Sequence, residues 1–148
     1  EDILEEIKNV IQELISVIDY NSPVFPFSEF TPYYEKEMGI DLKKIFFVTS
    51  RTTRKFVNLS SNPRVAILIN SSSNTESDFH EAVSVTALGT SKEIHGAEKN
   101  EVLNQYLAKH PYLESFAISP TCAVVGVAIT TYVMVKNFQQ VMELHMNQ

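Results

Sequence analysis

The sequence is poor in the residues that several kinds of functional site require. It has one cysteine, Cys122, so no disulfide can form within the chain. Only four glycines are present, and none lies in a Gly-rich phosphate-binding loop. The four histidines lie far apart, without metal-ligand spacing to one another or to the cysteine, so we expect no metal site. Function must therefore come from another arrangement of residues.

Long apolar segments and excess positive charge are also missing. The longest apolar run, Cys122 to Ile129, is interrupted after eight residues by Thr130, well short of the roughly 20 residues that span a bilayer. A net charge of −6 argues against wholesale binding to nucleic acid, which favours a basic face. No positively charged leader with an apolar stretch opens the sequence, and one cysteine suits a reducing compartment. We expect a cytoplasmic protein with no membrane or nucleic-acid partner.

What is present predicts one globular domain over residues 1–148, because 44% apolar content in this length can form a continuous core. Helical spacing of apolar residues predicts an amphipathic helix at about 2–16 and another helix over Glu98–Ala108. Residues 50–63 are expected to form one or two helical turns. The β-prone segments are 24–34, 44–49, 64–70, 82–94 and the C-terminal part, where 122–129 and 131–144 form one or two strands. Two prolines mark 24–34 as an edge or bulged strand, and Gly89 marks a possible bulge in 82–94.

About six short strands and at most three helices, without regular β-α-β alternation, argue against a doubly wound sheet. We expect a mainly β fold: a closed or nearly closed antiparallel barrel, Greek-key-like, with peripheral helices. Barrels of this kind remove exposed sheet edges and leave ligand sites at their mouths or at a dimer seam.

The basic residues are concentrated in one segment. From Lys43 to Thr75 there are six basic residues and no acidic one, whereas residues 1–42 contain ten acidic residues and two lysines. Such a segment suits an anion. Ordinary solvated lysines and arginines on a hairpin would give the same count, so charge alone leaves both interpretations open.

Residues 46–55 combine a strand end, several hydroxyls and two adjacent cations that lead into a helical turn. Thr53 can donate a hydroxyl hydrogen bond, Arg54 can bind two oxygens at once and Lys55 supplies a point charge, while free N–H groups of the turn add donors. The pattern predicts a phosphate site. A capped helix start with a solvated Arg-Lys pair is the alternative.

The run from Phe46 to Ile69, FFVTSRTTRKFVNLSSNPRVAILI, resembles the central motif of the pyridoxamine-phosphate-oxidase-like FMN-binding split-barrel superfamily. That motif has a strand, a Thr-Ser or Thr-Asn end, a Ser/Thr-Arg-Lys phosphate grip, a short helix ending in Asn-Leu and Asn-Pro, and an Arg-Val strand. Weaker matches lie at 24–32, 81–94 and 106–111. The resemblance implies an FMN-binding split barrel.

Residue by residue, the resemblance implies FMN with its phosphate on Thr53, Arg54 and Lys55. The flavin ring would lie against the main chain of two strand segments, which are Val48, Thr49 and Ser50, and Phe27, Ser28 and Glu29. Members of the superfamily are homodimers with flavin at the subunit seam, so partner residues around Lys136 to Phe138 would complete each site.

The activity implied is that of an FMN-dependent oxidoreductase, in which the flavin transfers electrons or hydride while the protein positions it. The sequence departs from true pyridoxamine phosphate oxidases, because it has no tryptophan and no C-terminal Arg-Leu-x-Pro pattern, and the first hairpin keeps only Pro23 of the usual turn. Vitamin B6 oxidation is therefore not expected. The substrate and the electron donor are not predicted.

Three alternatives remain open. A flavin-binding module could store, sense or shield the cofactor without turnover. A split barrel could bind haem, for which His145 is the C-terminal candidate for an axial ligand. A deazaflavin could replace FMN, since the phosphate contacts would be shared.

Overall fold

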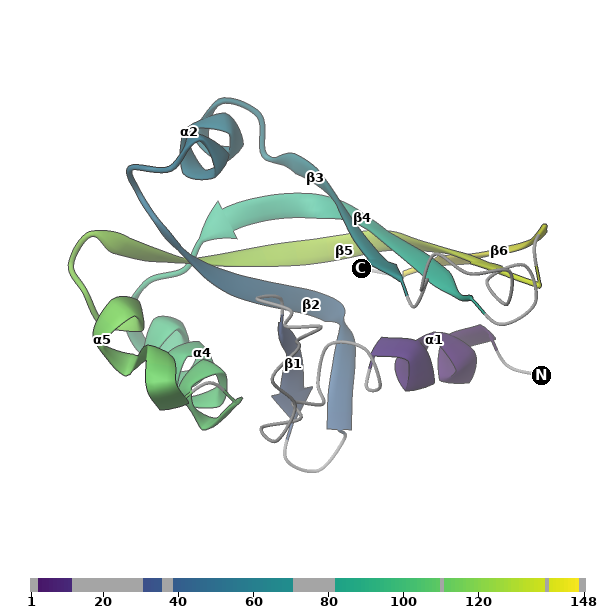
Figure 1. The fold of residues 1–148 in the computed structure, drawn as a ribbon, viewed down its shortest axis with the longest axis horizontal. Helices are drawn as coiled ribbons and strands as arrows, with labels where there is room; N and C mark the ends of the chain where they lie inside the picture. Colours follow the sequence, from purple (N-terminus) through teal and green to yellow (C-terminus); the bar gives the residue numbers. More distant parts are fainter. Residues whose placement is uncertain are drawn as a thin grey trace.

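The computed structural model describes residues 3–11, 31–35, 39–70, 82–109, 111–137 and 139–146. Within this part, six antiparallel strands form one sheet with helices at its periphery (Figure 1). The elements are α1 (Ile3–Ile11), β1 (Thr31–Glu35), β2 (Gly39–Ser50), α2 (Arg54–Ser61), β3 (Arg64–Asn70), β4 (Ser84–Glu93), α4 (Gly96–Lys109), η2 (Pro111–Leu113), α5 (Glu114–Ala117), β5 (Cys122–Lys136) and β6 (Gln140–His145). The expected mainly β, antiparallel fold with peripheral helices is confirmed.

The central strand of the sheet is β5. One of its edges pairs with β4, and the strand order is β1-β2-β5-β4-β3. The other edge is shared, because β2 pairs with residues 122–128 of β5 and β6 pairs with residues 131–136. Figure 1 shows β2 leaving β5 where β6 takes over toward the other end. The sheet therefore divides along β5, as in a split barrel.

Both faces of the sheet around β2 are covered. Ile45 and Phe47 lie in a first core, which also contains Ile7 of α1, whereas Phe46 and Val48 lie in a second core beneath α4 and α5. All five side chains are at most 3% exposed. A strand that is buried on both faces has a continuous apolar run in place of an alternating pattern.

The pairing is irregular at Gly89, as expected, but the extra residue of the bulge is Thr130 of β5, which lies opposite Leu88 and Gly89. The pairing of β4 with β5 shifts register between Leu88 and Gly89, and the Thr130 hydroxyl donates a hydrogen bond of 3.2 Å to the carbonyl oxygen of Leu88. This hydrogen bond holds β5 against β4 at the bulge, and β5 continues through the bulge. The last two strands are divided at residues 137–139, where Asn137 has a φ of 50°.

The other expected strands and helices agree with the structure over the residues that it describes, but η2 and α5 were not expected, so the described part has more than the three helices predicted. Helix α1 begins at Ile3, while residues 12–16 of the expected helix lie outside the described part. Strand β1 is an edge strand with a register shift at Pro32/Tyr33, as its prolines predicted, and residues 24–30 are not described. No helix of the described part is long and apolar enough to cross a membrane.

Replacing Tyr132 with phenylalanine is expected to lower the free energy of unfolding by about 1–3 kcal/mol, because a buried hydroxyl partner is lost. Tyr132 is fully buried and its hydroxyl donates a 2.6 Å hydrogen bond to the carbonyl oxygen of Leu42. Desolvation, assisted by the negative charge of Asp41, raises the pKa of Tyr132. Urea unfolding followed by circular dichroism at pH 7 measures the difference.

The raised pKa of Tyr132 makes the free energy of unfolding fall at alkaline pH. The folded state retains the tyrosine proton at pH values where the unfolded chain, with a pKa of about 10, releases it, so wild-type stability falls as pH rises above about 10. Tyr132→Phe should lack this component of the alkaline loss. Equal alkaline slopes in the two proteins would contradict the assignment.

Candidate functional site

The turn between β2 and α2 brings the predicted phosphate residues together at the end of the strand. Thr53 has extended backbone angles, φ −77° and ψ 152°, and caps α2. Its hydroxyl oxygen accepts a hydrogen bond of 3.2 Å from the Phe56 N–H and donates one of 2.9 Å to the Ser50 carbonyl oxygen. The Thr53 hydroxyl is thus engaged in holding the turn, and its predicted contact with a phosphate would replace the bond to Ser50.

The two cations of the motif lie in the first turn of α2 and are exposed. No acidic residue shares this turn, in which Arg54 and Lys55 lie at the positive end of the helix dipole. Lys55 Nζ lies 5.3 Å from the ring centroid of Phe47, which keeps the ammonium over the strand end. Within the described part of the chain, the Arg54 guanidinium has no ion-pair partner. An anion at this point would relieve the repulsion.

The end of β2 lies beside the start of β5. Val48, Thr49 and Ser50 pair with β5, and the described pairs with β1 stop at Phe46. Val48 and Thr49 are buried, and the Thr49 hydroxyl lies 3.2 Å from that of Thr53. Phe27, Ser28 and Glu29, the other predicted main-chain segment, lie outside the described residues.

Sequence reasoning missed the role of Arg51. Its guanidinium forms an ion pair with Glu93 and donates hydrogen bonds of 2.8 and 3.0 Å to the carbonyl oxygens of Pro120 and Cys122. Its backbone N–H bonds the Thr121 carbonyl oxygen at 2.9 Å. Arg51 therefore braces the turn that carries the two cations against the start of β5. These partners are 42 to 71 residues away in sequence, which is why local spacing could not indicate them.

Two C-terminal candidates also have defined surroundings. His145 of β6 is exposed, with Nδ1 3.3 Å from the Thr131 hydroxyl and Nε2 3.8 Å from the Glu143 carboxylate. Lys136 Nζ lies 2.6 Å from the Glu6 carboxylate of α1 in the same chain. Lys136 is thus part of the contact between α1 and β5, and its expected contribution to a partner's site stays a prediction. Phe138 is outside the described residues.

An antiparallel sheet that divides along β5, with a cationic helix start at the end of β2, defines a split-barrel protein. Three solved structures have a similar fold. The heme binding protein from Mycobacterium smegmatis has a TM-score of 0.61 and 16% identity, with 69% of this chain and 42% of that chain covered. A protein related to general stress protein 26 of the pyridoxinephosphate oxidase family, from Clostridium acetobutylicum, has a TM-score of 0.57 and 11% identity, with 96% and 93% covered. General stress protein 26 from Bacillus anthracis has a TM-score of 0.51 and 14% identity, with 94% and 99% covered.

At these identities the likeness establishes the fold alone, and the chain spans less than half the length of the heme binding protein. The family model described as a domain of unknown function, DUF4416, matches residues 1–79 of the 148 residues. The chain belongs to this family. No curated protein matches the sequence.

Proposed function

We propose that this protein binds FMN and acts as a flavin-dependent oxidoreductase other than a pyridoxamine phosphate oxidase. The observation that carries the proposal is the first turn of α2, where Arg54 and Lys55 lie beside each other at the positive helix end and the turn itself contains no acidic residue. A phosphate monoester is an anion that suits this turn, and Arg54 can bind two of its oxygens. The fold shared with a protein of the pyridoxinephosphate oxidase family supports the proposal.

Bound FMN would supply the electron or hydride transfer, and the chain would supply position and electrostatics. Arg54 and Lys55 would hold the phosphate, while the main chain of Val48 to Ser50 would face the ring. Arg51 keeps the turn in place through its bonds to Glu93 and to the start of β5. A single domain over residues 1–148 in the cytoplasm is part of the same proposal.

The first experiment is the visible spectrum of protein from a flavin-replete host, followed by titration of the apoprotein with FMN and with riboflavin. We expect bands of oxidised flavin, and we expect riboflavin, which lacks the phosphate, to bind at least about tenfold more weakly than FMN. Reduction of the bound flavin by a nicotinamide donor would separate an enzyme from a storage or sensing module. A colourless protein that ignores FMN would overturn the proposal, and the same titration with a deazaflavin tests that alternative.

A homodimer is part of the proposal, and the outer face of β3 and β4 is the surface that suits it. Leu68 is 61% exposed and Leu88 is 38% exposed, and Ala66, which pairs with Leu88, is exposed on the same face. Their neighbours Ile67 and Ala87 point into the first core. An uncovered apolar sheet face of this kind is typical of a contact between subunits.

Leu68→Lys is expected to weaken the dimer at least about tenfold, because it would bury an unpaired ammonium in the apolar contact. Ile118→Lys is the matched control, since Ile118 is 60% exposed but lies beyond α5, outside this sheet face. Analytical ultracentrifugation over a concentration series measures both variants. A wild-type protein that stays monomeric would contradict the proposal, as would equal dissociation constants for the two variants.

Haem is the second candidate ligand, and one observation favours it. His145 is an exposed histidine whose Nδ1 has a hydroxyl partner, Thr131, a contact that can hold the ring in one orientation. The similar fold of a heme binding protein supports this candidate. A Soret band after addition of hemin, lost in His145→Ala, would favour haem over flavin.

A further inference from the structure

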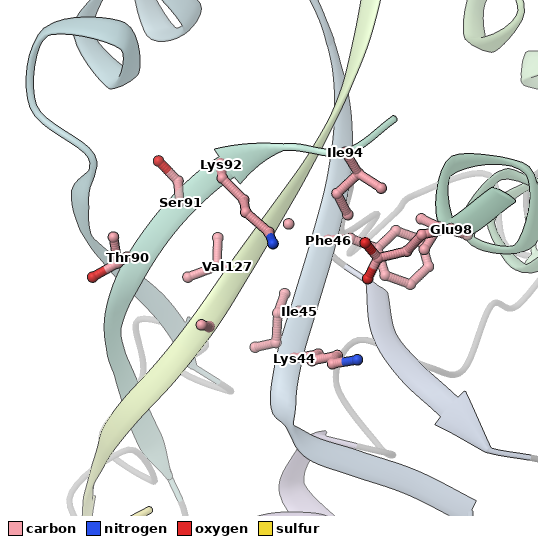
Figure 2. A pocket seen from close by; sticks show the side chains of 12 residues that line it. Lys44, Ile45, Phe46, Thr90, Ser91, Lys92, Ile94, Glu98 and Val127 are labelled. Atoms are coloured by element: carbon pink, nitrogen blue, oxygen red, sulfur yellow. The ribbon is translucent and has the colours of Figure 1, made fainter. Parts of the chain in front are cut away.

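A cavity lies away from the phosphate-binding turn, between strands β2, β4 and β5 and the start of α4 (Figure 2). Its volume is about 320 Å³, at the small end of the range for ligand pockets. Lys55 lies over Phe47, in the first core, whereas Phe46 of the cavity belongs to the second core. None of the residues of the cationic turn lines the cavity.

The inner wall of this cavity is apolar and firmly packed. Phe46, Ile94 and Val102 line it, and each is at most 6% exposed. Ile94 packs directly on Gly126, where a Cβ atom would lie 2.6 Å from Ile94 Cδ1. The wall therefore presents apolar side chains to an occupant of the cavity.

Two groups of opposite charge face the same space from different elements. Figure 2 shows the ammonium end of Lys92, from β4, and the carboxylate of Glu98, from α4, pointing into the cavity. Over the residues that the structure describes, neither side chain has a hydrogen bond or an ion pair with another protein group. Both side chains are exposed, so a ligand can reach them. Lys44 of β2 also lines the cavity, so two ammonium groups and one carboxylate surround its apolar wall, and Lys92 and Glu98 are the pair that points into the space.

We infer that this cavity binds a small zwitterion with an apolar body, the class to which free amino acids with apolar side chains belong. Lys92 binds the carboxylate of the ligand and Glu98 binds its ammonium group, because each receives a charge-assisted hydrogen bond or ion pair that the protein does not provide. The apolar side chain of the ligand packs on Phe46, Ile94 and Val102. An anion alone would leave Glu98 uncompensated, and an amine alone would leave Lys92 uncompensated.

The probe is leucine, compared with isocaproate, which lacks the ammonium group, and isoamylamine, which lacks the carboxylate. Isothermal titration calorimetry should show saturable binding of leucine, with each truncated probe weaker by about tenfold or more. Amide chemical-shift changes in NMR spectra should be centred on residues 44–46, 90–98 and 126–128. The readout requires no flavin, so it is independent of the proposed FMN site.

Substitutions at the two charged residues should separate their roles. Glu98→Gln is expected to weaken leucine about tenfold while leaving isocaproate unchanged, and Lys92→Gln should weaken leucine and isocaproate but leave isoamylamine unchanged. Glu114→Gln, which removes a carboxylate from α5 outside the cavity, is the control and should change nothing. Absence of leucine binding, equal binding of leucine and isocaproate, or leucine affinity unchanged in both variants would overturn the inference.

Discussion

The double variant Arg54→Ala, Lys55→Ala should lose at least about 100-fold in FMN affinity. Each hydrogen bond to a charged group contributes roughly 1.5–3 kcal/mol, so removing two costs about 3 kcal/mol or more. Fluorescence quenching of FMN during titration measures the change. Riboflavin affinity should be nearly the same in the variant and the wild type, because the lost contacts are those to the phosphate.

Two controls distinguish phosphate binding at the first turn of α2 from an effect of net charge or of lost stability. Lys43→Ala, Arg64→Ala removes the same total charge from two exposed positions outside the turn, and should change FMN affinity by about threefold or less, because solvent and salt screen distant charges. The Arg54→Ala, Lys55→Ala variant should keep its thermal stability, because alanine favours the helix and two cations at a helix start are unfavourable. Equal losses in the two double variants would contradict phosphate binding at the first turn of α2.

Gly89→Ala is expected to lower the free energy of unfolding by about 3 kcal/mol, because overpacking against a rigid group forces the backbone to move. A Cβ atom at Gly89 would lie 2.3 Å from the carbonyl oxygen of Ala128, and this oxygen belongs to the paired strand β5. Strand β4 could accept the methyl group only by moving away from β5 at this point. Urea unfolding followed by circular dichroism measures the loss.

Gly126→Ala is the matched control for this effect. There the added Cβ atom meets Ile94 Cδ1 at 2.6 Å, the far end of a side chain that can rotate, in place of a backbone oxygen. We expect a loss smaller than that of Gly89→Ala by about 1 kcal/mol or more, because a rotamer change costs less than a backbone shift. Similar losses for the two variants would show that β4 tolerates a side chain at Gly89, beside β5.

Features that depend on neighbouring residues could be predicted without the structure. The strand end, the turn and the first turn of α2 are contiguous, so the adjacency of Thr53, Arg54 and Lys55 follows from local preferences for strand, cap and helix. The edge position of the proline-containing β1 followed in the same way from the conformational limits of proline, whereas the bulged residue, Thr130 of β5, was not indicated by its own sequence. These local features depend little on how the strands pair in the sheet.

The arrangement of partners could not be predicted in this way. Backbone hydrogen bonds between strands carry little information about sequence, so nothing in β2 or β6 indicates that they share one edge of β5. Lys92 and Glu98 face one cavity only because β4, β5 and α4 enclose it together with Phe46 of β2. The amino-acid sequence therefore determined the chemistry of the cationic turn and the position of most strands. The division of the sheet along β5 and the charged cavity arise from contacts between distant segments, because such contacts form only when the chain packs.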